Sequence, residues 1–161
     1  MSARSMLLPI LAAAAISLAL PALAQVPVYG ANVNLEQARK AAAAAEAEAR
    51  KMSVPMAIAV VDTAGQLVYY VRHDNTQTGS VQVSQDKAVS AAMFRRPTKV
   101  FQDLVAGGGA GTRVMGLRNA NIVEGGLPLT VEGKIIGAIG VSGGSSEQDG
   151  VCAKAGNDAL K

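Results

Sequence analysis

The sequence predicts an α+β domain in which a five-stranded, mainly antiparallel sheet is flanked by helices. Two pairs of short, β-prone segments carry this prediction, 55–61 with 67–73 and 127–131 with 134–141, because a Gly-containing turn joins each pair as in a β-hairpin. Segments with the length and capping residues of helices precede the first pair, lie between the two pairs and follow the second pair. Hairpins on either side of central helices favour a helix-packed antiparallel sheet over a doubly wound α/β fold.

The first 24 residues are predicted to be a cleaved secretory signal. They contain one charge, Arg4, then an uncharged apolar run over residues 6–20 and the small-residue pattern Ala22-Leu23-Ala24, which is the anatomy of an export signal. The run is shorter than the roughly 20 apolar residues that a bilayer span needs. We therefore expect no membrane span, cleavage after Ala24, and a mature protein in the periplasm or outside the cell.

The rest of the chain is predicted to be an N-terminal arm, residues 25–33, followed by a single domain over residues 34–161. The formal net charge is only +3, and aromatic residues make up 3% of the chain. Nucleic-acid sites need clustered cations and often stacking aromatic rings. We therefore expect no nucleic-acid partner.

The chain has a single histidine, His73, and a single cysteine, Cys152. A zinc site of several His or Cys ligands therefore cannot form within one subunit, and an intrachain disulfide is impossible. Cys152 lies between Val151 and Ala153 in a helical pattern, so we expect a buried thiol. A disulfide between chains is the alternative in an oxidising compartment.

The first helix is predicted to begin after Asn34, because Gln37 stands three positions later and completes a capping box. Its apolar positions recur at spacings of three and four residues: Leu35, Ala38, Ala42, Ala45, Ala49 and Met52. The short alanine side chains allow this helix to approach a sheet or a neighbouring chain closely.

The remaining elements are predicted from periodicity and from capping or breaking residues. Residues 55–61 are nearly all apolar, as in a strand buried on both faces, and residues 67–73 alternate. The central part contains a helix capped by Thr78 or Ser80 that runs to Phe94 before Pro97, a short helix from Thr98 to Val105, and a flexible or tightly turning glycine-rich loop over 106–112. The last part contains strands over 121–123, 127–131 and 134–141, and a helix capped by Ser145 or Ser146 that ends near Leu160.

A G-x-S-x-G pattern at residues 140–144 has the sequence of a hydrolase nucleophile elbow. That site needs a base histidine after the serine in the chain, and no histidine follows Ser142. Glu147 and Asp149 occupy the first turn of the following helix, where they would repel a phosphate. We therefore interpret this segment as a glycine-rich turn into a capped helix.

His73 is a candidate functional residue because it is the only imidazole. It is either a strand-end histidine hydrogen-bonded beside Asp74 or an axial iron ligand in an apolar pocket, a site for which one good ligand is enough. The cations Arg95, Arg96 and Lys99 are either a solvated helix end or partners for the carboxylates of a bound acid.

Seven short segments carry a likeness to a known family: IAVVDTAG (58–65), RHD (72–74), KAVSAA (87–92), RPT (96–98), GGLP (125–128), IIGAIGVSG (135–143) and EQD (147–149). Together they resemble the GlcG/HbpS-like haem-binding domain family over about residues 34–161. The IGAIGVSG run with the following EQD is the most specific part.

The resemblance implies a compact domain with a profilin-like order of elements, often a homo-oligomer, that binds haem or a related tetrapyrrole. The family's older name suggests haem degradation. Our leading hypothesis is an exported haem-binding protein that acts in binding, storage or sensing rather than in turnover. We expect the haem between the sheet and the second helix. The residues expected to hold it are Arg95 or Arg96 at the propionates and Ser90, Met93, Thr98 or His73 at the iron, where His73 departs from the methionine frequent in the family.

Two other functions are alternatives. The chain is an accessory protein or an enzyme for a small hydroxy or keto acid if Asp62, Lys87 and Asp149 act as acid/base groups, although each is more simply a turn, surface or cap residue. It is a ligand-free assembly module if the alanine-rich first helix packs on another chain.

Overall fold

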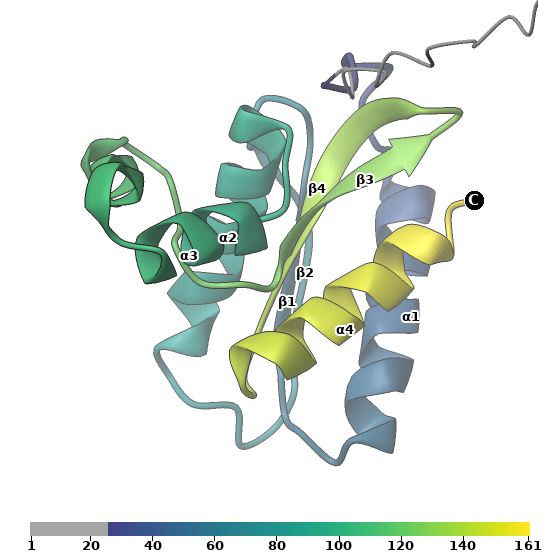
Figure 1. Cartoon of the computed structure of the whole chain (residues 1–161). Coiled ribbons are helices and arrows are strands. Elements are labelled where there is room, and N and C mark those ends of the chain that lie inside the picture. Colours follow the sequence, from purple (N-terminus) through teal and green to yellow (C-terminus); the bar gives the residue numbers. More distant parts are fainter. Residues whose placement is uncertain (1–25) are drawn as a thin grey trace, which may run out of the picture.

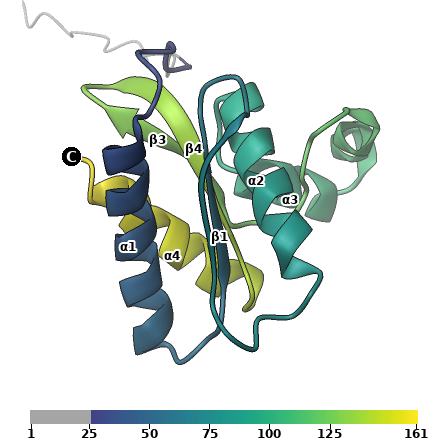
Figure 2. The same ribbon diagram turned by 180° about the vertical axis from the view of Figure 1, so that it is seen from behind.

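The computed structural model describes residues 26–161, which form one antiparallel sheet between two layers of helices (Figure 1). Helices α1 (Leu35–Lys51) and α4 (Ser146–Asp158) lie together on one face, and α2 (Ser80–Phe94) lies on the other (Figure 2). The expected single α+β domain is confirmed. The predicted signal and its cleavage site lie outside the described residues and stay predictions.

The sheet has four strands in the order β2-β1-β4-β3, and every neighbouring pair is antiparallel. Their bounds are Leu67–Arg72 for β2, Ala57–Val61 for β1, Lys134–Ser142 for β4 and Gly126–Val131 for β3. Both predicted hairpins form, and β1 and β4 pair to join them. All five residues of β1 are buried because helices cover both faces of this strand.

The strand predicted over residues 121–123 does not form, so the expectation of five strands was wrong. Side chains bond the backbone of this segment instead. The Asn121 N–H donates to Ser90 Oγ at 3.0 Å, and the Val123 N–H donates to Asn121 Oδ1 at 3.0 Å. These N–H groups are therefore satisfied without a neighbouring strand.

The segment before α1 is ordered and lies along the part of β4 that extends beyond β1. The Ile135 N–H donates to the Val28 carbonyl at 2.9 Å, and the Gly30 N–H donates to the Ile135 carbonyl at 2.7 Å. Tyr29 then reaches α2, where its hydroxyl donates to the Ala92 carbonyl at 2.8 Å. The arm thus ties β4 to the end of α2.

The alanine stripe of α1 faces α4 and the sheet. Five alanines of this helix are fully buried: Ala38, Ala41, Ala42, Ala45 and Ala49. Leu35, which the periodicity assigned to the same stripe, is 47% exposed. This stripe is therefore used inside the chain, whereas Ala43 and Ala47 on the outer side of the same helix are exposed.

The backbone of α2 lies directly against the sheet. The contact includes five fully buried alanines, namely Ala59, Ala88, Ala91, Ala92 and Ala138. A Cβ atom on Gly140 of β4 would lie only 2.0 Å from the Ser84 carbonyl oxygen of α2. This packing leaves no space for a macrocycle, so the pocket expected between the sheet and the second helix is wrong.

The chain after α2 differs from expectation in two places. Helix α3 spans Lys99–Ala106, but the Thr98 side chain does not cap it and accepts instead from the Gly126 N–H at 2.9 Å. The glycine-rich segment expected as a loop forms a 3₁₀ helix, η1, over Gly109–Gly116. Helices α3 and η1 pack on each other on the α2 side of the molecule (Figure 1).

Among residues 26–161, none of the helices has the length and hydropathy that crossing a membrane demands. The same residues contain no cluster of three or more His, Cys, Asp or Glu side chains that could hold a metal ion. Candidate metal chemistry in this part of the chain is therefore limited to sites with fewer such ligands.

Cys152 lies fully buried in α4, as a free thiol in the core. Burial raises the pKa of this thiol to about 12. Because the thiolate is the reactive form, we expect the folded protein to resist DTNB at pH 8 and the unfolded protein to react rapidly. Release of thionitrobenzoate with and without guanidinium measures this, and rapid labelling of the folded protein would contradict the buried placement.

Candidate functional site

A buried ion pair joins the two helical layers at one end of the sheet. Lys87 of α2 and Asp149 of α4 are 1% and 2% exposed, and Lys87 Nζ lies 2.7 Å from Asp149 Oδ2. Lys87 Nζ also donates to the Val141 carbonyl at 3.1 Å, and the Gly144 N–H donates to Asp149 Oδ1 at 3.0 Å. Burial raises the pKa of the Asp149 carboxyl, and Lys87 opposes that rise. The expectation that Lys87 is a surface residue is wrong.

Main chain covers this ion pair. A Cβ atom on Gly125, whose φ is +124°, would lie 2.8 Å from Lys87 Nζ. Asp62, the third acid/base candidate, lies near the opposite end of β1, where its Oδ1 accepts from the Ala64 and Gln66 N–H groups at 2.9 Å each. The structure therefore does not bring the three groups of the hydroxy-acid hypothesis to one site.

Ser142 of the G-x-S-x-G pattern is the last residue of β4 and is buried. Its hydroxyl donates to Ser80 Oγ at 3.0 Å, and Ser80 Oγ also accepts from Gln77 Nε2 at 2.9 Å. Helix α4 follows with a complete capping box between Ser145 and Gln148. The segment is thus a turn into a capped helix, with Ser142 in a core hydrogen bond.

His73 lies on the α1 face of the sheet, apart from the other predicted site residues. Its Nε2 is 3.2 Å from Glu46 Oε1 of α1, and its Nδ1 accepts from the Met56 N–H at 3.4 Å. Because Nδ1 accepts, Nε2 carries the proton and donates to Glu46. Iron ligation by His73 would require one of these two hydrogen bonds to open.

Ser90 and Thr98 are fully buried, and their hydroxyls hold the connection that leads to β3. Ser90 Oγ accepts from the Asn121 N–H at 3.0 Å, and Thr98 Oγ1 accepts from the Gly126 N–H at 2.9 Å. Both hydroxyls therefore have structural partners in this structure.

The other three predicted site residues lie near the end of α2. Met93 is 47% exposed. Arg95 adopts a left-handed conformation, with φ of 52°, and its guanidinium carbon lies 5.5 Å from the centre of the Tyr29 ring. Arg96 turns towards α3, where its guanidinium carbon lies 5.8 Å from the centre of the Phe101 ring. The six predicted residues are thus not gathered in one place.

A groove of about 610 Å³ opens between the end of α2, α3 and η1, and we call it the η1 groove. It is lined by Phe94, Arg96, Phe101, Leu104, Ala110, Gly111, Arg113, Val114 and Leu117. Phe94 and Phe101 meet edge to face with their ring centres 5.1 Å apart, and Arg96 Nε donates to the Phe94 carbonyl at 3.0 Å. The two arginines are the charged members of an otherwise apolar lining. This lining complements an apolar molecule that carries carboxylates.

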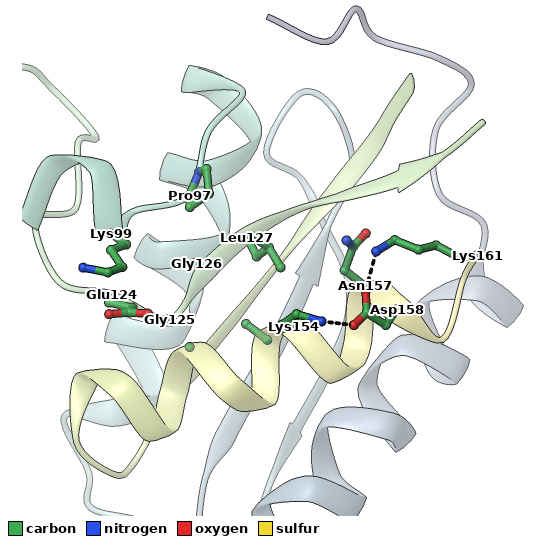
Figure 3. Close-up of a pocket in the computed structure, with 12 residues that line it drawn as sticks. Pro97, Lys99, Glu124, Gly125, Gly126, Leu127, Lys154, Asn157, Asp158 and Lys161 are labelled. Atoms are coloured by element: carbon green, nitrogen blue, oxygen red, sulfur yellow. Dashed lines mark hydrogen bonds and ion pairs between the residues drawn. The ribbon is translucent and has the colours of Figure 1, made fainter. Parts of the chain in front are cut away.

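A second groove, of about 380 Å³, lies between β3, α4 and the start of α3 (Figure 3). Its rim mixes charges of both signs. Lys154 and Lys161 both pair with Asp158, and burial raises the pKa of the Glu124 carboxyl on the opposite side. This α4 groove is smaller than the η1 groove, and each of its three lysines already pairs with a carboxylate of the chain.

Sequence patterns identified Arg96 but missed Phe94, Phe101 and Arg113, which line the same groove. Composition could have indicated the two phenylalanines, because the chain has only two and both flank the Arg96-Pro97 turn. Nothing local indicates Arg113, because it follows the segment 106–112 that was predicted to be a loop, whereas the structure places it in the 3₁₀ helix η1.

The described residues define an antiparallel α+β domain with helices on both faces of its sheet and an arginine-lined apolar groove. The chain belongs to the HbpS-like family, because the family model described as haem degrading protein HbpS-like matches residues 33–158. The resemblance seen in the short sequence segments is confirmed.

Three similar proteins illustrate the relationship. A Citrobacter freundii protein, described as an uncharacterized 15.0 kDa protein in the dhaT-dhaS intergenic region, is 37% identical over 132 residues, which cover 81% of this chain and 93% of the relative. A solved double mutant of Streptomyces reticuli HbpS has 29% identity and a TM-score of 0.74, covering 93% of this chain and 99% of that one. The solved PduOC:heme complex has 26% identity and a TM-score of 0.72, covering 81% and 96%.

Proposed function

We propose that this chain is an exported protein that binds haem, or a related tetrapyrrole, in the η1 groove for binding, storage or sensing. Membership in the HbpS-like family and the likeness to a protein solved with haem support the ligand class. The predicted signal in residues 1–24 supports export. The observation that carries the proposal is the η1 groove itself, an apolar groove with two arginines and no carboxylate in its lining.

The groove residues fit the ring and its carboxylates. Phe94 and Phe101 offer apolar surface to a macrocycle, and Arg96 and Arg113 offer guanidinium groups to its propionates. The Arg96 Nε bond to the Phe94 carbonyl fixes this guanidinium and leaves its other N–H groups free to donate. Bound haem would supply an iron centre whose ligand and redox chemistry belongs to the cofactor.

The groove lining offers no iron ligand of the usual kinds. None of its residues carries an imidazole, thiol, thioether or phenol group. Of the four predicted iron ligands, Met93 is the one with a substantially exposed side chain, on the same helix end. We therefore propose that the groove holds haem through contacts with its ring and its propionates. Ligation of the iron by Met93, Ser90, Thr98 or His73 stays a prediction.

Titration with haemin tests the proposal. We expect a saturable shift of the Soret band at micromolar haemin, and about tenfold weaker binding for Arg96→Ala and for Arg113→Ala, because each removes one charge-assisted hydrogen-bonding group. Arg39→Ala is the matched control, because Arg39 is an exposed arginine on α1, on the other face of the sheet. Protoporphyrin IX without iron should compete for the site, and the dimethyl ester of haemin should bind more weakly than haemin.

Two results would reject the proposed site. The absence of a saturable shift would remove haem binding altogether. Unchanged affinity in both arginine variants, with a normal shift, would place the haem outside the η1 groove.

A further inference from the structure

Glu124 forms one end of the α4 groove, which we call the carboxylate end (Figure 3). The Glu124 N–H donates to Gln102 Oε1 of α3 at 2.8 Å, so the backbone is held in place at this point. A side chain at Gly150 would overlap Glu124 Oε1, so the carboxylate lies against the bare backbone of α4. Within residues 26–161, this carboxylate forms no hydrogen bond or ion pair. Burial raises its pKa, and a cation beside it would offset the cost of burying its charge.

Asn157 of α4 stands at the opposite end of the groove, which we call the amide end (Figure 3). The side chain is 9% exposed, and its Oδ1 accepts from the Thr130 N–H at 2.8 Å and from Thr130 Oγ1 at 3.2 Å. Because a backbone N–H can only donate, these bonds fix which way the amide is turned. The two N–H groups of Nδ2 have no acceptor within residues 26–161. A buried amide with unused donors at a groove points to an acceptor that occupies the groove.

The ion pairs of the groove give its two ends opposite charge. At the carboxylate end, Asp103 pairs with Lys99 at 2.7 Å and neutralises it, so the carboxylate of that end stays uncompensated. At the amide end, Lys154 and Lys161 share one carboxylate, that of Asp158, so one positive side-chain charge remains. The groove therefore complements a molecule with a positive group at one end and a negative group at the other.

The surface between the two ends is apolar and rigid. It includes Leu127 and Ala153, and the groove volume is about 380 Å³. Thr98 holds the start of β3, because its Oγ1 accepts from the Gly126 N–H at 2.9 Å and its N–H donates to the Gly126 carbonyl at 3.0 Å. A preformed apolar floor lowers the entropic cost of ordering a site around a small ligand.

We propose that the α4 groove is a second ligand site, which binds a short ω-amino acid. The ligand's ammonium pairs with Glu124, its carboxylate accepts from Asn157 Nδ2, and its methylene groups cover the apolar floor. Because neither residue lines the η1 groove, this site is independent of the proposed haem site.

The helix sets the length of the ligand. Gly150, which lies under the Glu124 carboxylate, stands seven residues before Asn157 on α4, so the two ends are about 10 Å apart. Two hydrogen bonds of about 2.8 Å each leave about 5 Å between the charged atoms of the ligand. A four-carbon chain suits this separation, and 4-aminobutanoate is therefore the probe of choice.

Two-dimensional NMR of the isotopically labelled protein tests the site directly. Titration with 4-aminobutanoate should give saturable shifts, at millimolar ligand, in the Asn157 side-chain amide and in the backbone amides of Gly125 and Gly126. Butylamine and butanoate each lack one charged end and should bind at least tenfold more weakly. Equal binding of butylamine would overturn the assignment of the amide end, and equal binding of butanoate would overturn that of the carboxylate end.

Two conservative variants complete the test. Glu124→Gln removes the charge and keeps the size of the side chain, and Asn157→Asp keeps the oxygen that accepts from Thr130 but replaces the donors with a carboxylate. Each should weaken binding at least tenfold. Glu36→Gln is the control, because Glu36 is an exposed carboxylate on α1 and should leave affinity unchanged. Unchanged affinity in both groove variants, or no saturable shift of the Asn157 amide in the wild-type protein, would overturn the proposal.

Discussion

Replacing Lys87 with methionine is expected to lower the free energy of unfolding by about 3–5 kcal/mol at pH 7. Methionine matches the length of the lysine stem but leaves the Asp149 carboxylate buried without its cation, at a position only 2% exposed. The Val141 carbonyl also loses a donor. Because this pair links α2 to α4 across the end of the sheet, its loss weakens both layers. Denaturant unfolding followed by far-UV circular dichroism measures the effect.

Two further variants distinguish the effect of the uncompensated Asp149 charge from the effect of losing the Lys87 side chain. The double variant Lys87→Met with Asp149→Leu should recover most of the loss, because replacing both members of a buried pair by apolar groups is often neutral or stabilising. Lys99→Met breaks the exposed pair between Lys99 and Asp103 and should cost less than about 1 kcal/mol. A double variant as unstable as Lys87→Met would show that the uncompensated charge is not the cause.

The stability deficit of Lys87→Met should shrink as the pH falls. Burial raises the pKa of the Asp149 carboxyl in the folded state, and in this variant Lys87 no longer opposes that rise. A carboxyl with a raised folded pKa destabilises the fold above that pKa, and the penalty disappears as the pH falls towards the ordinary aspartate pKa of about 3.9. Unfolding curves at pH 7 and pH 5 should therefore show a smaller difference between variant and wild type at pH 5. An equal stability difference between variant and wild type at pH 7 and at pH 5 would show that the Asp149 charge is not the cause of the loss.

The parts of the fold that the sequence predicted are those determined by neighbours along the chain. The capping boxes of Asn34 with Gln37 and of Ser145 with Gln148 span three residues, and both form. The β-hairpins are equally local. The erroneous strand over 121–123 fails for a non-local reason, because the hydroxyl that bonds the Asn121 N–H comes from Ser90 on α2. The hydrophobic periodicity and the β propensity of residues 121–123 cannot indicate a partner that lies on another helix.

The site was less predictable because long-range contacts build it. Arg96 was identified from its charge beside a helix end, but the groove also needs η1, whose Arg113 stands far along the chain. Lys87 and Asp149 are separated by 62 positions, so neither residue alone indicates that the other neutralises it in the core. The expectation that the haem pocket lies between the sheet and α2 was wrong, because the alanines of α2 and Gly140 of β4 let the helix backbone lie directly against the sheet.

Gly140 makes this close approach possible, and Gly140→Ala is expected to lower the free energy of unfolding by about 3 kcal/mol or more. The added Cβ would lie 2.0 Å from the Ser84 carbonyl oxygen and 2.5 Å from the Ala88 backbone nitrogen. Both atoms belong to the backbone of α2, so no change of rotamer relieves the overlap, and this exceeds the usual 1–3 kcal/mol of an overpacked core. Thermal and denaturant unfolding measure the loss.

The matched control is Gly79→Ala at the start of the same helix. Gly79 has helical dihedral angles, and an added Cβ there meets no atom within 4 Å. This substitution should be neutral or slightly stabilising, because alanine reduces the conformational entropy of the unfolded chain. If Gly140→Ala were tolerated equally well, α2 would have freedom to move away from β4, and the space excluded between helix and sheet would again be available to a ligand. A large loss at Gly140 with none at Gly79 means instead that the backbone of α2 is held tightly against β4, which leaves no room for a ligand between them.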